Sequence, residues 1–216
     1  MTRKLFWDDP YLRMLDTTVE TVMDDCITLR ETIFYAFSGG QESDAGTIGG
    51  HAVLEARKDG LQIVYRLADG YGLRAGDPVR IEIDWERRYR LMRLHFAAEV
   101  VLELFSHALN AVGTAEKIGA HIAADKARID FQWPQNIALL FPQITAAAQK
   151  LIDSDQPIIS SFDDETGQRR YWEVPGFARV PCGGTHLKRT GEVGVLSLQR
   201  KNVGKGKERV MIHVKP

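Results

Sequence analysis

Short stretches of alternating or β-branched residues dominate the first third of the chain. Such stretches, each followed by turn residues, predict strands at 17–23, 27–35, 51–57, 61–67 and 79–85. The pair at 51–57 and 61–67 flanks Lys58-Asp59-Gly60 and is typical of a hairpin. About five short strands of this kind favour a small β-barrel-like domain.

The hydrophobic period changes near residue 86. Residues 87–112 contain no Pro or Gly and carry apolar residues on most faces, which predicts a long, largely buried helix. The remaining pattern predicts strands at 118–123, 127–131, 158–162 and 170–174, a helix at 137–152, and a hairpin of 193–201 with 208–214. We therefore expect an α+β fold with a barrel-like domain at 1–86 and an α+β domain at 87–216.

Composition places the chain among ordinary globular proteins. Its 216 residues are 44% hydrophobic and 26% charged, which excludes a disordered chain or a coiled coil. No apolar stretch approaches the roughly 18 residues that span a bilayer, and the first residues lack the apolar core of a signal peptide. We expect a soluble, cytoplasmic protein with no membrane partner and with Cys26 and Cys182 reduced. The sequence does not indicate an oligomeric state.

Charge is unevenly distributed along the chain. The net charge is −1, yet residues 188–215 hold eight Lys or Arg against two Glu. Such a basic segment indicates a surface for a polyanion such as nucleic acid. A solvated hairpin whose lysines protect an edge strand explains it equally well.

Four residues have the chemistry of a metal site. His95 and Glu99 stand four positions apart on the long helix, so their side chains share one face. Cys182 and His186 flank a Gly-Gly-Thr segment that can fold tightly. The four side chains together suit a tetrahedral Zn²⁺ ion. Each pair taken alone has a simpler explanation: a hydrogen-bonded helix pair, and an accidental loop spacing.

The Gly-rich segment 38–47 matches neither the P-loop nor the dinucleotide-binding fingerprint, and by composition it is an ordinary turn. In combination, however, several motifs resemble the freestanding editing domain of alanyl-tRNA synthetase, the AlaX family. These are Phe34-Tyr35, Ser38-Gly39-Gly40-Gln41, Asp44-x-Gly46, His95 with a second helix ligand, Cys182-Gly183-Gly184-Thr185-His186, and Thr190-Gly191-Glu192-Val193-Gly194. The Cys-Gly-Gly-Thr-His loop and the segment after it are the most specific of them.

The resemblance implies a barrel-like domain joined to an editing domain of the threonyl/alanyl-tRNA synthetase type. It also implies zinc-dependent removal, in trans, of a wrong amino acid from mischarged alanine tRNA, usually serine and sometimes glycine. The family holds its metal with two helix histidines and the Cys and His of the loop. His95, Cys182 and His186 match that set, and Glu99 stands in place of the second helix histidine.

The same resemblance assigns further residues. Gln41 would be the catalytic contact, and Thr32 would meet the hydroxyl of serine in a substrate pocket completed by Gly40, Gly184 and Thr185. The basic residues that would contact tRNA are Lys188, Arg189, Arg200, Lys201, Lys205, Lys207 and Arg209.

Glu99 leaves alternatives open. A carboxylate ligand makes the ion less positive and a poorer Lewis acid, so the zinc could position a water or the tRNA 3′ end, or be purely structural. A tRNA- or nucleotide-binding protein with reduced or lost activity, or a hydrolase of another aminoacyl ester, would have the same motifs.

Overall fold

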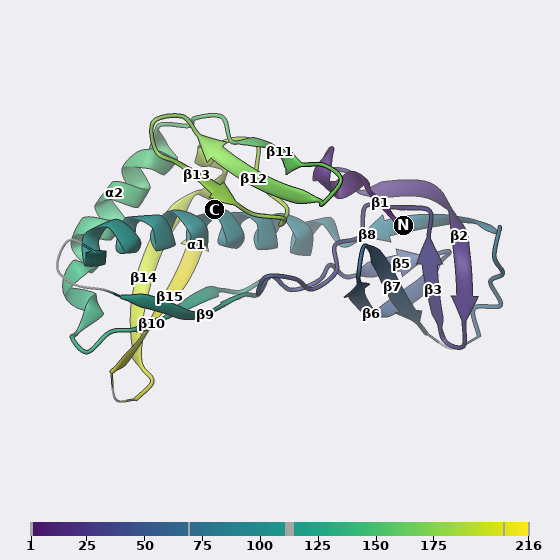
Figure 1. Cartoon of the computed structure of the whole chain (residues 1–216), viewed down its shortest axis with the longest axis horizontal. Coiled ribbons are helices and arrows are strands. Elements are labelled where there is room, and N and C mark those ends of the chain that lie inside the picture. The colour runs from purple at the N-terminus through teal and green to yellow at the C-terminus, as the bar shows by residue number, and fades with distance from the viewer. Residues whose placement is uncertain (1, 69, 111–114, 205, 216) are drawn as a thin grey trace. The chain divides into compact units, whose positions relative to one another are not determined.

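The computed structural model describes residues 2–68, 70–110, 115–204 and 206–215 (Figure 1). The chain divides into two compact units, Met1–Tyr89 and Arg90–Pro216. The division falls after residue 89, whereas the hydrophobic pattern predicts it after residue 86.

The N-terminal unit is a ring of antiparallel strands. Its strands pair in the order β2 (Met14–Met23), β3 (Cys26–Leu29), β7 (Gln62–Leu67), β6 (His51–Asp59), β5 (Gly46–Ile48) and β8 (Pro78–Ile83), and β8 pairs back with β2, which closes the barrel. The ring encloses apolar side chains such as Ile27, Leu29, Ile63 and Ile81, each 1% exposed or less. The short strands β1 (Arg3–Lys4) and β4 (Glu31–Thr32) form a separate parallel pair, and a 3₁₀ turn covers Leu5–Trp7.

The predicted strand at 27–35 was wrong in its second half. Strand β3 ends at Leu29, β4 covers two residues, and residues 33–35 belong to no strand. Side chains take the backbone groups of these residues: the amide of Phe34 donates to Thr32 Oγ1, and that of Tyr35 donates to Asp44 Oδ2. Trp85 begins a helix and does not extend strand β8.

Two sheets and two helices make up the C-terminal unit. Its antiparallel four-stranded sheet has the order β14 (Val195–Asn202), β15 (Lys207–Lys215), β10 (Ala127–Gln132) and β9 (Glu116–Ile122). The three-stranded sheet has the order β11 (Ile159–Asp164), β12 (Arg169–Val174) and β13 (Ala178–Pro181). Helix α2 (Phe141–Asp153) follows a 3₁₀ turn at Ile137–Leu140, and another 3₁₀ turn, Thr190–Val193, precedes β14.

The long helix α1 (Trp85–Asn110) packs against both sheets of this unit. Phe105 meets Phe131 of β10 with ring centroids 5.6 Å apart, and Phe96 meets Trp172 of β12 at 5.2 Å. These two pairs lie on opposite sides of the helix, so α1 buries apolar side chains on more than one face, as its sequence predicts. The predicted helix end at 111–112 lies outside the described residues.

The structure contains few helices and many strands, which agrees with the mixed α and β composition that the sequence predicts. In the part of the chain that the structure describes, none of the helices has the length and apolar character needed to cross a membrane.

Candidate metal centre

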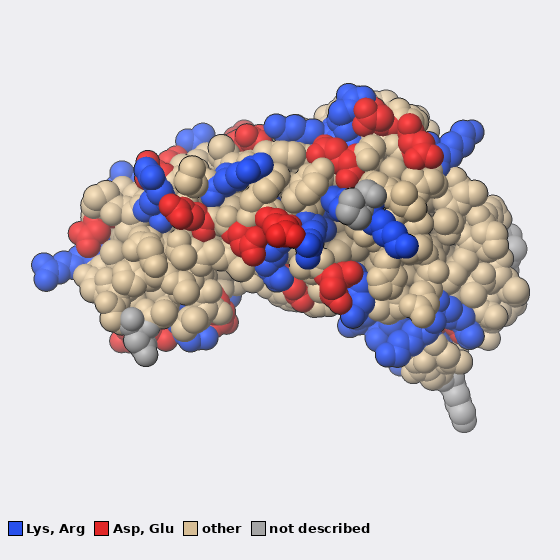
Figure 2. All heavy atoms as spheres, turned by 180° about the vertical axis from the view of Figure 1, so that it is seen from behind, with Lys and Arg blue, Asp and Glu red and all other residues tan. Residues whose placement is uncertain are grey.

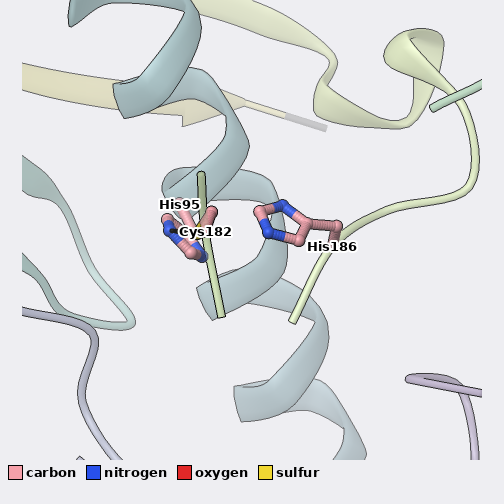
Figure 3. A group of neighbouring side chains, drawn as sticks. All are labelled: His95, Cys182 and His186. Carbon is pink, nitrogen blue, oxygen red and sulfur yellow. Dashed lines mark hydrogen bonds between the residues drawn. The ribbon is translucent and has the colours of Figure 1, made fainter. Parts of the chain in front are cut away.

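Three candidate ligands, His95, Cys182 and His186, gather against the long helix of the C-terminal unit, and Glu99 lies beside them (Figure 3 draws the first three). His95 lies on α1 and is 6% exposed, and Glu99 lies one turn further along with 16% of its side chain exposed. Cys182 and His186 come from the loop that follows β13. Since the helix is otherwise apolar here, these side chains must find partners in one another.

The distances define a compact cluster. The ligand atoms of His95, Cys182 and His186 all lie within 4.8 Å of one another, and Cys182 Sγ is 3.5 Å from His95 Nε2. The carboxylate of Glu99 bridges the two histidines: Oε1 lies 3.4 Å from His95 Nε2, and Oε2 lies 3.9 Å from His186 Nδ1. Ligand atoms that each lie about 2.0–2.3 Å from one ion are at most roughly 4 Å apart. The ligand atoms of this cluster, within 4.8 Å of one another, are close to that separation.

The loop is held so that the thiol faces the helix. The amide of Cys182 donates to the carbonyl of Arg170 on β12 at 2.8 Å, which extends the pairing of β12 with β13 by one residue. The amide of Gly184 turns back and donates to Cys182 Sγ at 3.4 Å. Such a donor stabilises sulfur in its negatively charged form. Gly184 and the buried Thr185 therefore lie between two candidate ligands, and Gly184 supports one of them directly.

Several buried polar atoms of this cluster lack hydrogen-bond partners among the described residues. They are His95 Nδ1, Glu99 Oε2 and both ring nitrogens of His186. A buried polar atom without a partner costs about 1–3 kcal/mol, and more when it is charged. Four such atoms within one cluster are consistent with a cation that the side chains would share. Two imidazoles, a thiol and a carboxylate form a suitable donor set for a divalent metal.

The pKa shifts within the cluster also indicate that a positive charge would be stabilised there. Burial raises the pKa of Glu99, but His95 outweighs this effect and lowers the pKa to about 2. Burial lowers the pKa of His95, but Glu99 and Cys182 outweigh it and hold the pKa well above its usual range. Burial lowers the pKa of His186 to about 3 and raises that of Cys182. The ionised carboxylate is thus balanced by a proton on His95, which a metal ion can replace.

The predicted residues Thr32, Gly40 and Gln41 belong to the N-terminal unit. Thr32 is fully buried, and its Oγ1 accepts the amide of Phe34 and lies 2.6 Å from Tyr65 Oη. Its hydroxyl is therefore engaged inside the unit, and contact with a substrate stays a prediction. Gly40, with φ 89°, lies in a tight turn, and Gln41 is 1% exposed.

Basic side chains gather over the β14–β15 hairpin (Figure 2). Lys201 lies opposite Arg209 in the strand register, so both belong to the outer face of the sheet, as does the exposed Lys207. Lys205 lies outside the described residues. Arg128 of β10, which was not among the predicted contacts, lies on the same face and pairs with Asp130.

Three of the predicted tRNA contacts are arginines that already pair with carboxylates. Arg209 contacts Asp130 at 2.6 Å and 2.9 Å, and Arg189 contacts Asp155 at 2.7 Å. Arg200 points to the other face of the sheet and pairs with the buried Glu208. These partners neutralise much of the expected positive charge. Lys188 is exposed beside Arg189.

Comparison with known proteins identifies the family. The alanyl-tRNA editing protein AlaX-M of Pyrococcus horikoshii is 36% identical over 215 residues, which cover 97% of this chain and 96% of that protein. The chain belongs to the alanyl-tRNA editing protein family. This confirms the resemblance inferred from the motifs.

Other relatives agree with this family membership. AlaX-M of Methanosarcina acetivorans is 32% identical over 97% of this chain and 98% of its own length. The alanine–tRNA ligase of Ignicoccus hospitalis is 32% identical over 91% of this chain, which corresponds to 24% of the ligase. Residues 173–211 match the threonyl and alanyl tRNA synthetase second additional domain, and this range contains Cys182 and His186.

Proposed function

We propose that this protein hydrolyses, in trans, the ester that joins a wrong amino acid to alanine tRNA, with serine as the expected amino acid and glycine as the second candidate. The buried His-Cys-His cluster carries this proposal, because it lies within a chain that matches an alanyl-tRNA editing protein over nearly its full length. Relatives named alanyl-tRNA editing proteins match this chain over 96% and 98% of their own length, which supports hydrolysis in trans.

We propose Zn²⁺ as the metal, held by His95, Cys182 and His186 with Glu99 as the fourth ligand. Two imidazoles and a thiolate favour zinc over the hard cations Mg²⁺ and Ca²⁺. The unpartnered Oε2 of Glu99, buried between the two histidines, supports the fourth ligand. When bound, zinc supplies positive charge that can fix the 3′ end of the tRNA or a water molecule.

The reaction needs an attacking water, donors for the negative charge that develops on the carbonyl oxygen, and a proton for the departing ribose oxygen. We assign the donor role to the amide group of Gln41 and to backbone N–H groups of the glycine-rich turn. Gly184 and Thr185 would orient the aminoacyl end. Thr32 would select serine through a hydrogen bond between the two hydroxyl groups, which alanine cannot form.

Binding of tRNA is assigned to the exposed lysines of the basic segment. Lys201 and Lys207 on the outer sheet face are the strongest candidates, with Lys188 and Lys205 as further contacts. Arg189, Arg200 and Arg209 would have to leave or share their carboxylate partners in order to contact phosphate.

The proposal is tested by release of serine, glycine and alanine from the corresponding charged alanine tRNAs, after bound zinc is quantified. Cys182→Ala should lose zinc and serine release, whereas Cys26→Ala, which changes the other cysteine in the N-terminal unit, should lose neither. Turnover that survives complete loss of zinc in Cys182→Ala would contradict a catalytic metal. No release from any of the three substrates by zinc-loaded protein would favour a tRNA-binding protein.

A further inference from the structure

The guanidinium of Arg88 connects the two ends of the loop that carries Gln41. Arg88 and Asp44 are both fully buried in the N-terminal unit. Arg88 Nε donates to Asp44 Oδ1 at 2.8 Å, and Arg88 Nη2 donates to Asp44 Oδ2. The same Nη2 also donates to the carbonyl of Ile33 at 2.6 Å. Since Ile33 precedes Gln41 and Asp44 follows it, Arg88 holds both ends of this loop.

The carboxylate of Asp44 completes the closure. Its Oδ2 accepts the amide of Tyr35 at 2.6 Å, and the amide of Asp44 donates to the carbonyl of Tyr35 at 3.0 Å. Arg88 Nη1 donates to the carbonyl of Pro10 at 2.9 Å, so the N-terminal segment is tied to the same group. Most donors of the guanidinium are therefore used on fixed backbone and carboxylate acceptors.

Further bonds order the rest of the loop. Ser38 and Gln41 exchange two backbone hydrogen bonds, at 3.0 Å and 3.2 Å, around the turn at Gly39 and Gly40. Tyr35 Oη donates to the carbonyl of Ser38 at 3.2 Å. Beyond the turn, Arg87 donates from Nε to the carbonyl of Ser43 at 3.1 Å. Gln41 thus lies between anchored points on either side.

Stability alone does not require such a pair. Burying two charges has a desolvation free energy that their mutual attraction roughly cancels. Apolar residues of similar volume therefore often stabilise a fold as well or better. A planar guanidinium does supply fixed directions for several hydrogen bonds at once, which the ammonium group of lysine cannot reproduce.

We propose that Arg88, through Asp44, is a positioning residue that holds the Gln41 loop in the conformation needed for ester hydrolysis. This inference rests on the proposed function and on its assignment of Gln41. It predicts that the effect of Arg88 on turnover passes through Gln41, and that Arg88 has no separate effect on metal binding.

A double-mutant cycle tests the coupling. Arg88→Lys, Gln41→Ala and the double variant are compared by kcat and KM for serine release, with Arg80→Lys as the control, because Arg80 pairs with Asp16 at the surface of the same unit. Arg88→Lys should lower kcat by about tenfold or more, because misplacement by about 1 Å can cost 100-fold. In the Gln41→Ala background it should cause no further loss. The proposal would be overturned if the fold-losses of kcat in the two single variants multiplied in the double variant, or if Arg88→Lys left kcat unchanged.

Hydrogen exchange provides a readout that does not depend on activity. Amides of residues 34–44 should exchange faster in Arg88→Lys, while the barrel strands and zinc content stay as in the wild type. Should Arg88→Lys fail to fold, Asp44→Asn is measured instead, because it removes the charge and keeps the shape. Unchanged exchange in the loop, or equal acceleration throughout the unit, would overturn the proposal. If the wild type releases no serine, the proposed function fails, and loop exchange still decides whether Arg88 orders this segment.

Discussion

Glu99 sets the charge of the buried cluster. Two neutral imidazoles and one thiolate leave a bound Zn²⁺ ion with a net charge of about +1, and the carboxylate lowers this to about zero. The carboxylate therefore strengthens retention of the ion and weakens its Lewis acidity. If Glu99 is a ligand as proposed, it would favour tight retention of the ion over strong polarisation of a substrate.

Glu99→Gln tests this role, because it keeps the size of the side chain and removes its charge. We expect zinc affinity to fall by about 10- to 100-fold, as measured by competition with a chromogenic chelator. Glu103→Gln, one turn further along the same helix and outside the cluster, should leave zinc affinity unchanged. Equal affinities for wild type and Glu99→Gln would exclude Glu99 as a ligand.

Protons bound by the metal-free cluster lead to a second prediction. The raised pKa values of His95 and Cys182 keep both groups protonated near pH 7, whereas the pKa of His186, lowered to about 3, leaves that imidazole neutral. Zinc binding should therefore release up to two protons, and affinity should fall as pH decreases. Calorimetric titration in buffers of different ionisation enthalpy counts these protons. Binding without proton release would contradict this charge pattern.

Among the strands of the barrel, Gly46 permits β5 to approach β8. A Cβ atom at this position would lie 2.1 Å from the carbonyl oxygen of Glu82 on β8, so backbone would have to move. We expect Gly46→Ala to lower the free energy of unfolding by about 2 kcal/mol or more in chemical denaturation. Gly50→Ala is the matched control, because its φ of 81° is unfavourable for alanine but its surroundings are open. It should cost only about 1 kcal/mol; equal losses would show that the close approach does not matter.

The elements that were predicted correctly are those with long local patterns. Helices α1 and α2 and the strands of the β14–β15 hairpin follow from the period of apolar residues within single segments. Strands β1, β4 and β13 have two to four residues, too few for a period to be recognised. β1 and β4 form because segments far apart in the sequence pair with each other, and β13 forms as the second strand of a short hairpin with β12. The strand expected at 33–35 is absent for a different reason, because side-chain oxygens of Thr32 and Asp44 accept the amides of Phe34 and Tyr35.

For the molecule as a whole, the basic segment should bind phosphate without reading sequence. Lys201→Gln combined with Lys207→Gln should weaken tRNA binding and reduce the slope of log affinity against log salt by about one for each phosphate that is no longer neutralised. Fluorescence anisotropy with uncharged tRNA measures both quantities. Lys58→Gln, an exposed lysine on β6 of the other unit, is the control. An unchanged salt slope would remove these two lysines from the tRNA interface.

The family, the mixed α and β composition, the long buried helix and three candidate ligands, His95, Cys182 and His186, all follow from the amino-acid sequence. Local periodicity predicts the elements, and motifs whose members lie close together in the chain identify the family. Which charges are free depends on the folded chain: Arg209 is paired with Asp130, Arg189 with Asp155 and Arg200 with Glu208, across segments far apart in sequence or on facing strands. The place of Arg88 at the base of the Gln41 loop likewise emerges only in three dimensions, because a buried ion pair between residues 44 positions apart leaves no periodic signal in the sequence.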